Sequence, residues 1–232
     1  MKSFYYLFVN LACVSIPLIA SFYKKYPFYK NWKHFFKANL IVSFLFITHD
    51  IYFTSIGVWG FNQSYLINFF DILNLPLEEV LFFICIPYAC VFTYFVFSKY
   101  VPEDLIHVNF YKGVLNFLIL LTLLSLLINY EYLYTFFTSF FLFLILMFIK
   151  LKKIDIRKVI LSYIAIIPFF FLSNGILTGS FIEEPIVWYN HKENLDLRMF
   201  TIPVEDVFYG FLLIISNCLL FDYFKYGNIK RI

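Results

Sequence analysis

The sequence has few charged residues and little glycine, and both shortages exclude classes of protein. Asp, Glu, Lys and Arg make up only 14% of the 232 residues, against roughly 25% in an ordinary soluble domain. The net charge of +3 is too small to indicate a nucleic-acid-binding surface. The seven glycines form no Gly-x-Gly-x-x-Gly pattern, so we expect no dinucleotide or flavin fold.

Metal-binding patterns are also missing. The four cysteines lie separately in apolar runs, so we expect them to pack as small side chains rather than bind metal or form disulfides. No Asp-rich cluster of the kind that holds Mg²⁺ and a diphosphate is present, which argues against a prenyl transferase. The sequence therefore predicts no metal and no cofactor.

Apolar residues dominate instead, at 62% of the chain with a mean hydropathy of +0.80. A helix needs roughly 20 apolar residues, or about 17 at the short end, to cross a bilayer. Runs of this length occur near 4–22, 35–51, 77–97, 113–129, 132–149, 157–173 and 204–224. We therefore expect an all-α integral membrane protein with seven transmembrane helices, the first of them a span rather than a cleaved signal peptide.

The basic residues predict the orientation of these helices. If each run crosses once, 15 of the 18 Lys and Arg residues fall on one side, and only Lys2, Lys192 and Arg198 fall on the other. Cytoplasmic loops carry the excess of Lys and Arg. We therefore expect a multi-pass protein of the cell (inner) membrane, with its amino terminus outside and its carboxyl terminus in the cytoplasm.

The second half of the sequence repeats the first. After the second apolar run come "HDIYFTSIGVWGFN" and "LPLEEVLFF"; after the sixth come "SNGILTGSFIEEPIVWYN" and "IPVEDVFYG". The aligned pairs are Trp59 with Trp188, Asn62 with Asn190, Pro76 with Pro203, Glu78 with Glu205, and Glu79 with Asp206. This predicts two parallel three-helix repeats, 1–98 and 131–232, joined by a connecting helix within 99–130.

The paired acids have a structural and a functional interpretation. Proline followed by acids is a favourable helix start, because proline has no N–H to leave unpaired and carboxylates complement the helix dipole. However, an ionised side chain at mid-bilayer costs about 2.5–3.5 kcal/mol, and less near an interface, so intramembrane acids are functional-site hypotheses. Because the pattern occurs twice, we favour the functional interpretation. Adjacent buried carboxyls share protons, which suits general acid and base roles.

Aromatic residues suggest the chemistry of such a site. The chain holds 34 Phe, 19 Tyr and 3 Trp, most of which we expect simply to pack or face lipid. Aromatic faces stabilise a cation by roughly 2 kcal/mol or more when it is desolvated. An acid, aromatic walls and access from the bilayer together suit protonation of an alkene, rearrangement of the carbocation and loss of a proton.

The stretches "HDIYFTSIGVWGFN…LPLEEVLFFICIPYACVFTYFVF" and "IPVEDVFYGFLL" resemble the membrane-integral, flavin-free lycopene cyclase domain family, in its fused tandem form. The resemblance covers most of the chain and includes the duplicated Pro-x-Glu-Glu/Asp motif. It implies an intramolecular lyase or isomerase that converts the acyclic ψ-ends of lycopene, or of a related acyclic carotenoid, to β-ionone rings without flavin. The implied partners are this carotenoid, the lipid bilayer and other carotenoid biosynthetic enzymes.

The resemblance also implies site residues. Glu78 and Glu205 are the expected proton donors, while Glu79 and Asp206 tune them or act as bases. The expected substrate-binding residues are Asp50, Trp59, Asn62, Trp188 and Asn190. Asp50 is equally well explained as a solvated residue at a helix end. The second repeat replaces His49 and Asp50 with Ser173 and Asn174 and adds "FIEEP", so the two halves need not do equal work.

Two other functions remain to be compared. A retinal protein needs a Schiff-base lysine within its last helix, and the last span has none before Lys225 at its cytoplasmic end. A non-catalytic carotenoid-binding or transport protein is the stronger alternative, because parallel repeats and acids near one face also suit carriers. Substitution of the carboxylates separates this alternative from a cyclase, since a binder would keep its pigment without them, whereas a cyclase would keep its substrate and stop converting it.

Overall fold

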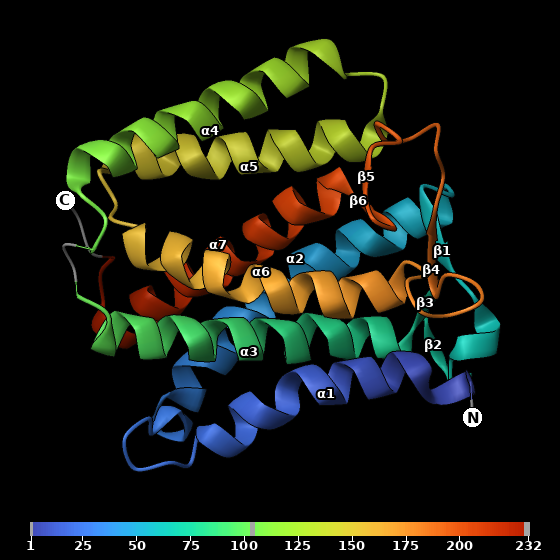
Figure 1. Ribbon diagram of the computed structural model, residues 1–232, viewed down its shortest axis with the longest axis horizontal. Coiled ribbons are helices and arrows are strands. Elements are labelled where there is room, and N and C mark those ends of the chain that lie inside the picture. The colour runs from blue at the N-terminus through green and yellow to red at the C-terminus, as the bar shows by residue number, and fades with distance from the viewer. Residues whose placement is uncertain (1, 103–104, 230–232) are drawn as a thin grey trace.

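The computed structural model describes residues 2–102 and 105–229, and these residues form seven α-helices. Each helix overlaps one predicted span, which confirms the all-α prediction for the described part of the chain. Their bounds are α1 Tyr5–Ala20, α2 Trp32–Ser55, α3 Leu77–Tyr100, α4 Val108–Ile128, α5 Leu133–Lys152, α6 Arg157–Leu177 and α7 Val204–Tyr226. The helices lie side by side, and α1 begins and α7 ends at opposite ends of the bundle (Figure 1).

Six of these helices, all except α2, are long and apolar enough to cross a membrane. Helix α2 has the length, at 24 residues, but it carries Lys33 and Lys37 near its start and Asp50 near its end. Its polar residues Asn39 and Ser43 are buried against the rest of the bundle. The structure therefore supports six of the seven predicted spans directly.

Short strands, which the sequence did not lead us to expect, gather at the end of the bundle where α3 and α7 begin (Figure 1). We call this the carboxylate end. Strand β2 (Asp71–Ile72) pairs with β3 (Leu75–Pro76), and β5 (Arg198–Met199) pairs with β6 (Ile202–Pro203). Each hairpin runs directly into a helix, α3 or α7, so the internal repeat seen in the sequence recurs in the structure.

One pair of strands joins the two repeats. Strand β1 (Trp59–Phe61) is antiparallel to β4 (Val187–Tyr189), with Trp59 opposite Tyr189 and Gly60 opposite Trp188. A Cβ atom at Gly60 would lie 2.4 Å from the indole ring of Trp188. Glycine is therefore required here by the close approach of this ring.

The helices of the two repeats pack across each other. Helix α2 of the first repeat packs on α7, and α6 of the second repeat packs on α3, while α1 packs on α3 and α5 on α7. The connecting helix α4 lies outside this group and packs mainly on α5 (Figure 1). This crossed arrangement brings α3 and α7, with their acidic first turns, into contact at the centre of the protein.

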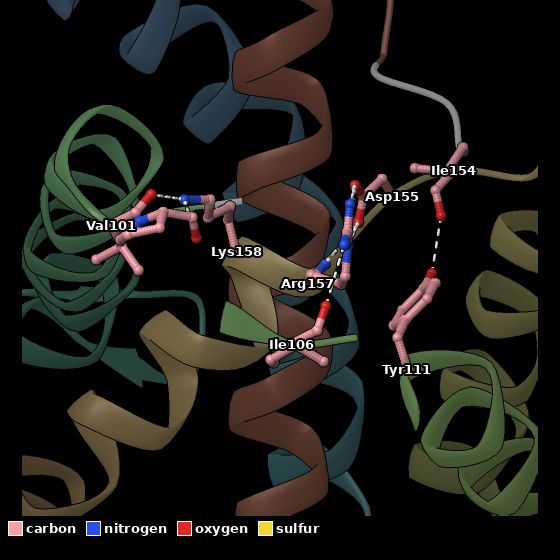
Figure 2. Close-up of polar contacts among 8 residues, drawn as sticks. Val101, Ile106, Tyr111, Ile154, Asp155, Arg157 and Lys158 are labelled. Atoms are coloured by element: carbon pink, nitrogen blue, oxygen red, sulfur yellow. Dashed lines mark hydrogen bonds and ion pairs between the residues drawn. The ribbon is translucent and has the colours of Figure 1, made fainter. Parts of the chain in front are cut away.

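At the opposite end, polar contacts attach the connecting segment to the second repeat (Figure 2). Arg157 bonds to Asp155 at 2.7 Å and donates a 3.0 Å hydrogen bond to the carbonyl of Ile106. The hydroxyl of Tyr111, in α4, donates to the carbonyl of Ile154 at 2.8 Å. These contacts set the position of α4 relative to the ends of α5 and α6.

Candidate active site

The first acid of each pair holds the loop before its own helix. Oε1 of Glu78 accepts a 2.7 Å hydrogen bond from the backbone N–H of Ile67, 11 residues earlier. Oε1 of Glu205 accepts a 2.8 Å bond from the N–H of Leu195, 10 residues earlier. Both side chains are buried. The two repeats therefore use Glu78 and Glu205 in the same way, to close a loop against a helix start.

The second acid of each pair points elsewhere, because adjacent helix residues project about 100° apart. Glu79 accepts a hydrogen bond from the hydroxyl of Tyr6 in α1. Asp206 accepts one of 2.6 Å from the hydroxyl of Tyr134 in α5. Each tyrosine belongs to the first helix of its repeat, so this pairing is also duplicated.

Asp206 has two further donors. Its Oδ2 atom accepts a 2.7 Å hydrogen bond from the side-chain amide of Asn174 and a 2.9 Å bond from the hydroxyl of Tyr189. Burial raises the pKa of Tyr189, in β4, well above its ordinary value, and Asp206 raises it further. Tyr189 therefore stays protonated near neutral pH and acts as a donor. Both carboxyl oxygens of Asp206 therefore have donors from the protein.

Carboxyl groups of the two repeats converge in the interior. Glu79 interacts electrostatically with Asp50 and with Asp206, and all three side chains are buried. We call Asp50, Glu79 and Asp206 the carboxyl centre. Within residues 2–102 and 105–229, no ion pair joins any of the three to a cation. Acids of both repeats are thus close enough to influence one another in the interior.

Aromatic side chains surround the carboxyl centre. The rings of Trp59 and Tyr134 lie 5.1 Å apart between centroids, and those of Trp59 and Phe53 lie 5.0 Å apart. Trp59 also interacts with Asp50, and Tyr209 interacts electrostatically with all three carboxyls. The Oδ2 atom of Asp50 and the hydroxyl of Tyr209 are buried without a hydrogen-bond partner. Polar atoms left unpaired in this way are available to a bound molecule or water.

The other expected binding residues lie in loops. Oδ1 of Asn62 accepts a hydrogen bond from the N–H of Ser64, and Oδ1 of Asn190 accepts one from the N–H of Lys192, both at 3.1 Å. These are turn-forming contacts. Trp188 is 43% exposed and covers Gly60. Asp50 and Trp59 lie at the carboxyl centre, and a substrate-binding role for all five residues stays a prediction.

Several residues of the site were missed from the sequence. They are Tyr6, Tyr134, Asn174, Tyr189 and Tyr209. The internal repeat could have identified two of them. Tyr6 precedes Glu79 by 73 residues and Tyr134 precedes Asp206 by 72, so the two tyrosines occupy nearly matching positions in the two repeats. Asn174 was identified as the counterpart of Asp50, but its contact with Asp206 follows only from the packing of α6 beside α7.

Comparison with family models identifies the family of this chain. The family model described as "Lycopene cyclase" matches residues 3–97 and 131–224, that is, both repeats. No curated protein and no solved structure matches the chain.

Proposed function

The chain belongs to the lycopene cyclase family, and on this premise we propose that it converts the acyclic ends of lycopene to β-ionone rings, giving γ- and β-carotene. The reaction is an isomerisation without net oxidation, of the intramolecular lyase type. The observation that carries the proposal is the carboxyl centre, where acids from both repeats meet in an aromatic interior.

The physical basis is the difficulty of ionising several buried carboxyls together. Charges in a low-dielectric interior repel strongly and lose their hydration, and no cation pairs with Asp50, Glu79 or Asp206 among the described residues. The group therefore holds at least one proton near neutral pH. A carboxylic acid beside a carboxylate provides both a proton donor and a proton acceptor.

Cyclisation needs both. The acid protonates a terminal C=C bond, whose π electrons form the new C–H bond and leave a tertiary cation. The π electrons of a second double bond then form the ring C–C bond, and a carboxylate removes a ring proton to give the final double bond. Because the proton taken up is returned, no reductant or nucleotide is consumed. Faces of rings such as Trp59 and Tyr209 stabilise the cation by roughly 2 kcal/mol.

The hydrogen bonds also support different roles for two acids of the carboxyl centre, Asp206 and Glu79. Tyr134, Asn174 and Tyr189 all donate to Asp206. This favours an ionised Asp206 that acts as a base or stabilises a nearby cation. Glu79 accepts a hydrogen bond from Tyr6 and interacts electrostatically with both other members of the centre. We propose that it exchanges protons with them.

We also propose that α2 is the seventh span and that the carboxylate end faces outward. Helix α2 is about 36 Å long at 1.5 Å per residue. Its buried Asn39 donates to the carbonyl of Phe83 at 2.9 Å, and Ser43 donates to the same carbonyl at 2.8 Å. Polar groups paired inside the bundle do not face lipid. With seven crossings, the distribution of Lys and Arg places the strands outside.

The test is expression in cells that accumulate lycopene, followed by pigment analysis, and then purified protein with lycopene in lipid without reductant or nucleotide. We expect γ- and β-carotene, with one deuterium incorporated per ring when the reaction runs in D₂O. The Glu79→Gln and Asp206→Asn variants should bind lycopene and form little product. Unaltered lycopene with the wild-type protein would refute the cyclase, and a carotenoid-binding protein would hold lycopene unchanged in wild type and variants alike.

A further inference from the structure

A groove of about 380 Å³ lies beside Glu205, between α4, α5 and α7. This volume is in the range of small-molecule sites, about 300–1,000 Å³. Two residues that line the groove, Ile128 and Leu197, are 70% and 62% exposed. The apolar residues that line the groove are Leu121, Leu124, Ile128, Leu195, Leu197, Val204 and Phe208. Exposed apolar residues beside a groove are what entry of an apolar ligand from lipid would require.

Glu205 is the carboxyl group among the residues that line this groove. Its side chain is 3% exposed. Oε1 accepts two hydrogen bonds, from the hydroxyl of Thr135 at 2.6 Å and from the N–H of Leu195 at 2.8 Å, whereas Oε2 is buried without a partner. The protein therefore leaves Oε2 as the carboxyl oxygen of Glu205 without a partner of its own.

The remaining polar side chains of the groove are largely satisfied by the protein. Ser125 and Ser139 bond to each other at 2.8 Å across α4 and α5, and Thr122 donates to the carbonyl of Leu118 at 2.9 Å. Apart from Oε2 of Glu205, the hydroxyl of Thr138 is the unpartnered buried polar atom among the described lining residues. An apolar ligand can therefore occupy most of the groove without leaving polar atoms unpaired.

The first repeat is built differently at the matching place. Tyr6 and Tyr134 are equivalent, so Asn10, four residues after Tyr6, corresponds to Thr138. The amide of Asn10 is fully buried and donates to the carbonyl of Glu78 at 2.8 Å. Thr138 makes no such contact and lines the groove instead. Helix α4, held by the Ser125–Ser139 and Tyr111–Ile154 bonds, forms the outer wall beside Glu205.

We propose that this groove admits the acyclic end of the polyene laterally from the lipid, and that Glu205 of the second repeat, rather than Glu78 of the first, is the proton donor. The inference rests on the proposed cyclase function and makes the two repeats unequal. In this step the acid form of Glu205 gives a proton from Oε2 to the terminal double bond, and a tertiary cation forms. After the ring C–C bond forms, a carboxylate removes a ring proton, as in the proposed function, and a proton returns to Glu205.

Two pairs of variants test the donor and the groove. Glu205→Gln keeps an oxygen that can accept from Thr135 and Leu195 but carries no acidic proton, so ring formation should fall about 10²–10⁴-fold. Glu78→Gln should cause a loss at least about tenfold smaller than that of Glu205→Gln. Leu124→Trp, at the groove, should slow ring formation severalfold, whereas Leu123→Trp, the adjacent residue of α4 outside the groove, should not.

The readouts are single-turnover ring formation, absorption of bound lycopene, and elution of each variant as a monodisperse species in detergent. Glu205→Gln should still bind lycopene, which separates loss of the donor from loss of the site. If wild-type protein forms no ring, the proposed function fails. If wild-type protein forms rings, the inference is overturned by equal losses in Glu78→Gln and Glu205→Gln, by equal rates in the two Trp variants, or by failure of folded Glu205→Gln to bind lycopene.

Discussion

The hydroxyl group of Tyr134 donates a 2.6 Å hydrogen bond to Oδ1 of Asp206, although 72 residues separate them in the chain. The first repeat forms the same contact between Tyr6 and Glu79 across 73 residues. In each case a residue of the first helix of a repeat meets the second acid of the third helix. This duplicated pair connects the outer helices α1 and α5 to the carboxyl centre.

Removal of these hydroxyls should impair catalysis more than folding. Tyr6→Phe should reduce ring formation more than Tyr134→Phe, because Asp206 keeps two other donors, Asn174 and Tyr189. A hydrogen bond to a charged group contributes about 1.5–3 kcal/mol, so we expect losses of roughly ten- to a hundredfold for Tyr6→Phe. Rates of cyclisation in lipid measure this. Tyr130→Phe, at an exposed tyrosine, is the control, and equal rates in all three variants would contradict the prediction.

Asp50 of the first repeat corresponds to Asn174 of the second, and each can be replaced by the residue of the other repeat. One replacement removes a carboxyl group from the interior and the other adds one. Asp50→Asn removes a carboxyl from the centre, and we expect ring formation to fall at least about tenfold with the fold retained. Asn174→Asp instead replaces the amide that donates to Asp206 with a second carboxyl.

The Asn174→Asp protein should lose stability as the pH rises. At low pH the new carboxyl is protonated and can still donate to Asp206, whereas its ionisation would place two like charges together in the interior. The thermal midpoint in detergent, measured from pH 5 to pH 8 for this variant and for wild type, tests the prediction. A constant difference between the two proteins over this range would contradict it.

Gly60 should tolerate no side chain. Gly60→Ala places a methyl group 2.4 Å from the Trp188 ring, and overpacking of this kind costs about 1–3 kcal/mol. Gly113→Ala is the matched control, since no atom lies within 4 Å of the added methyl group, and alanine favours a helix by about 0.8–1 kcal/mol over glycine. Thermal unfolding in detergent should show a lower midpoint for Gly60→Ala and an equal or higher one for Gly113→Ala.

The proposed orientation can be tested by labelling. Biotin-acceptor tags inserted after Asn68 or Lys192, in the loops of the carboxylate end, should react with a membrane-impermeant reagent added outside intact cells. A tag after Lys153, between α5 and α6, should react only after the cells are opened. If only the tag after Lys153 were labelled in intact cells, the proposed orientation would be wrong.

Helix positions could be predicted because they depend on local sequence. An apolar run long enough to cross lipid must form its backbone hydrogen bonds within itself, so it becomes a helix wherever it packs. The predicted span 77–97 therefore agrees with α3, Leu77–Tyr100, and 204–224 agrees with α7, Val204–Tyr226. Pro76 and Pro203, each followed by acids, also marked these two helix starts correctly.

The sequence alone thus determined the helices, the internal repeat and the four paired acids, because each is written in residues close together in the chain. Only the tertiary structure decided which acid faces which environment and that both repeats contribute to one centre. That result depends on α2 packing against α7 and α6 against α3. Contacts between helices arise from the shape and polarity of whole helix faces. The spacing of residues along the sequence does not specify which of these faces meet.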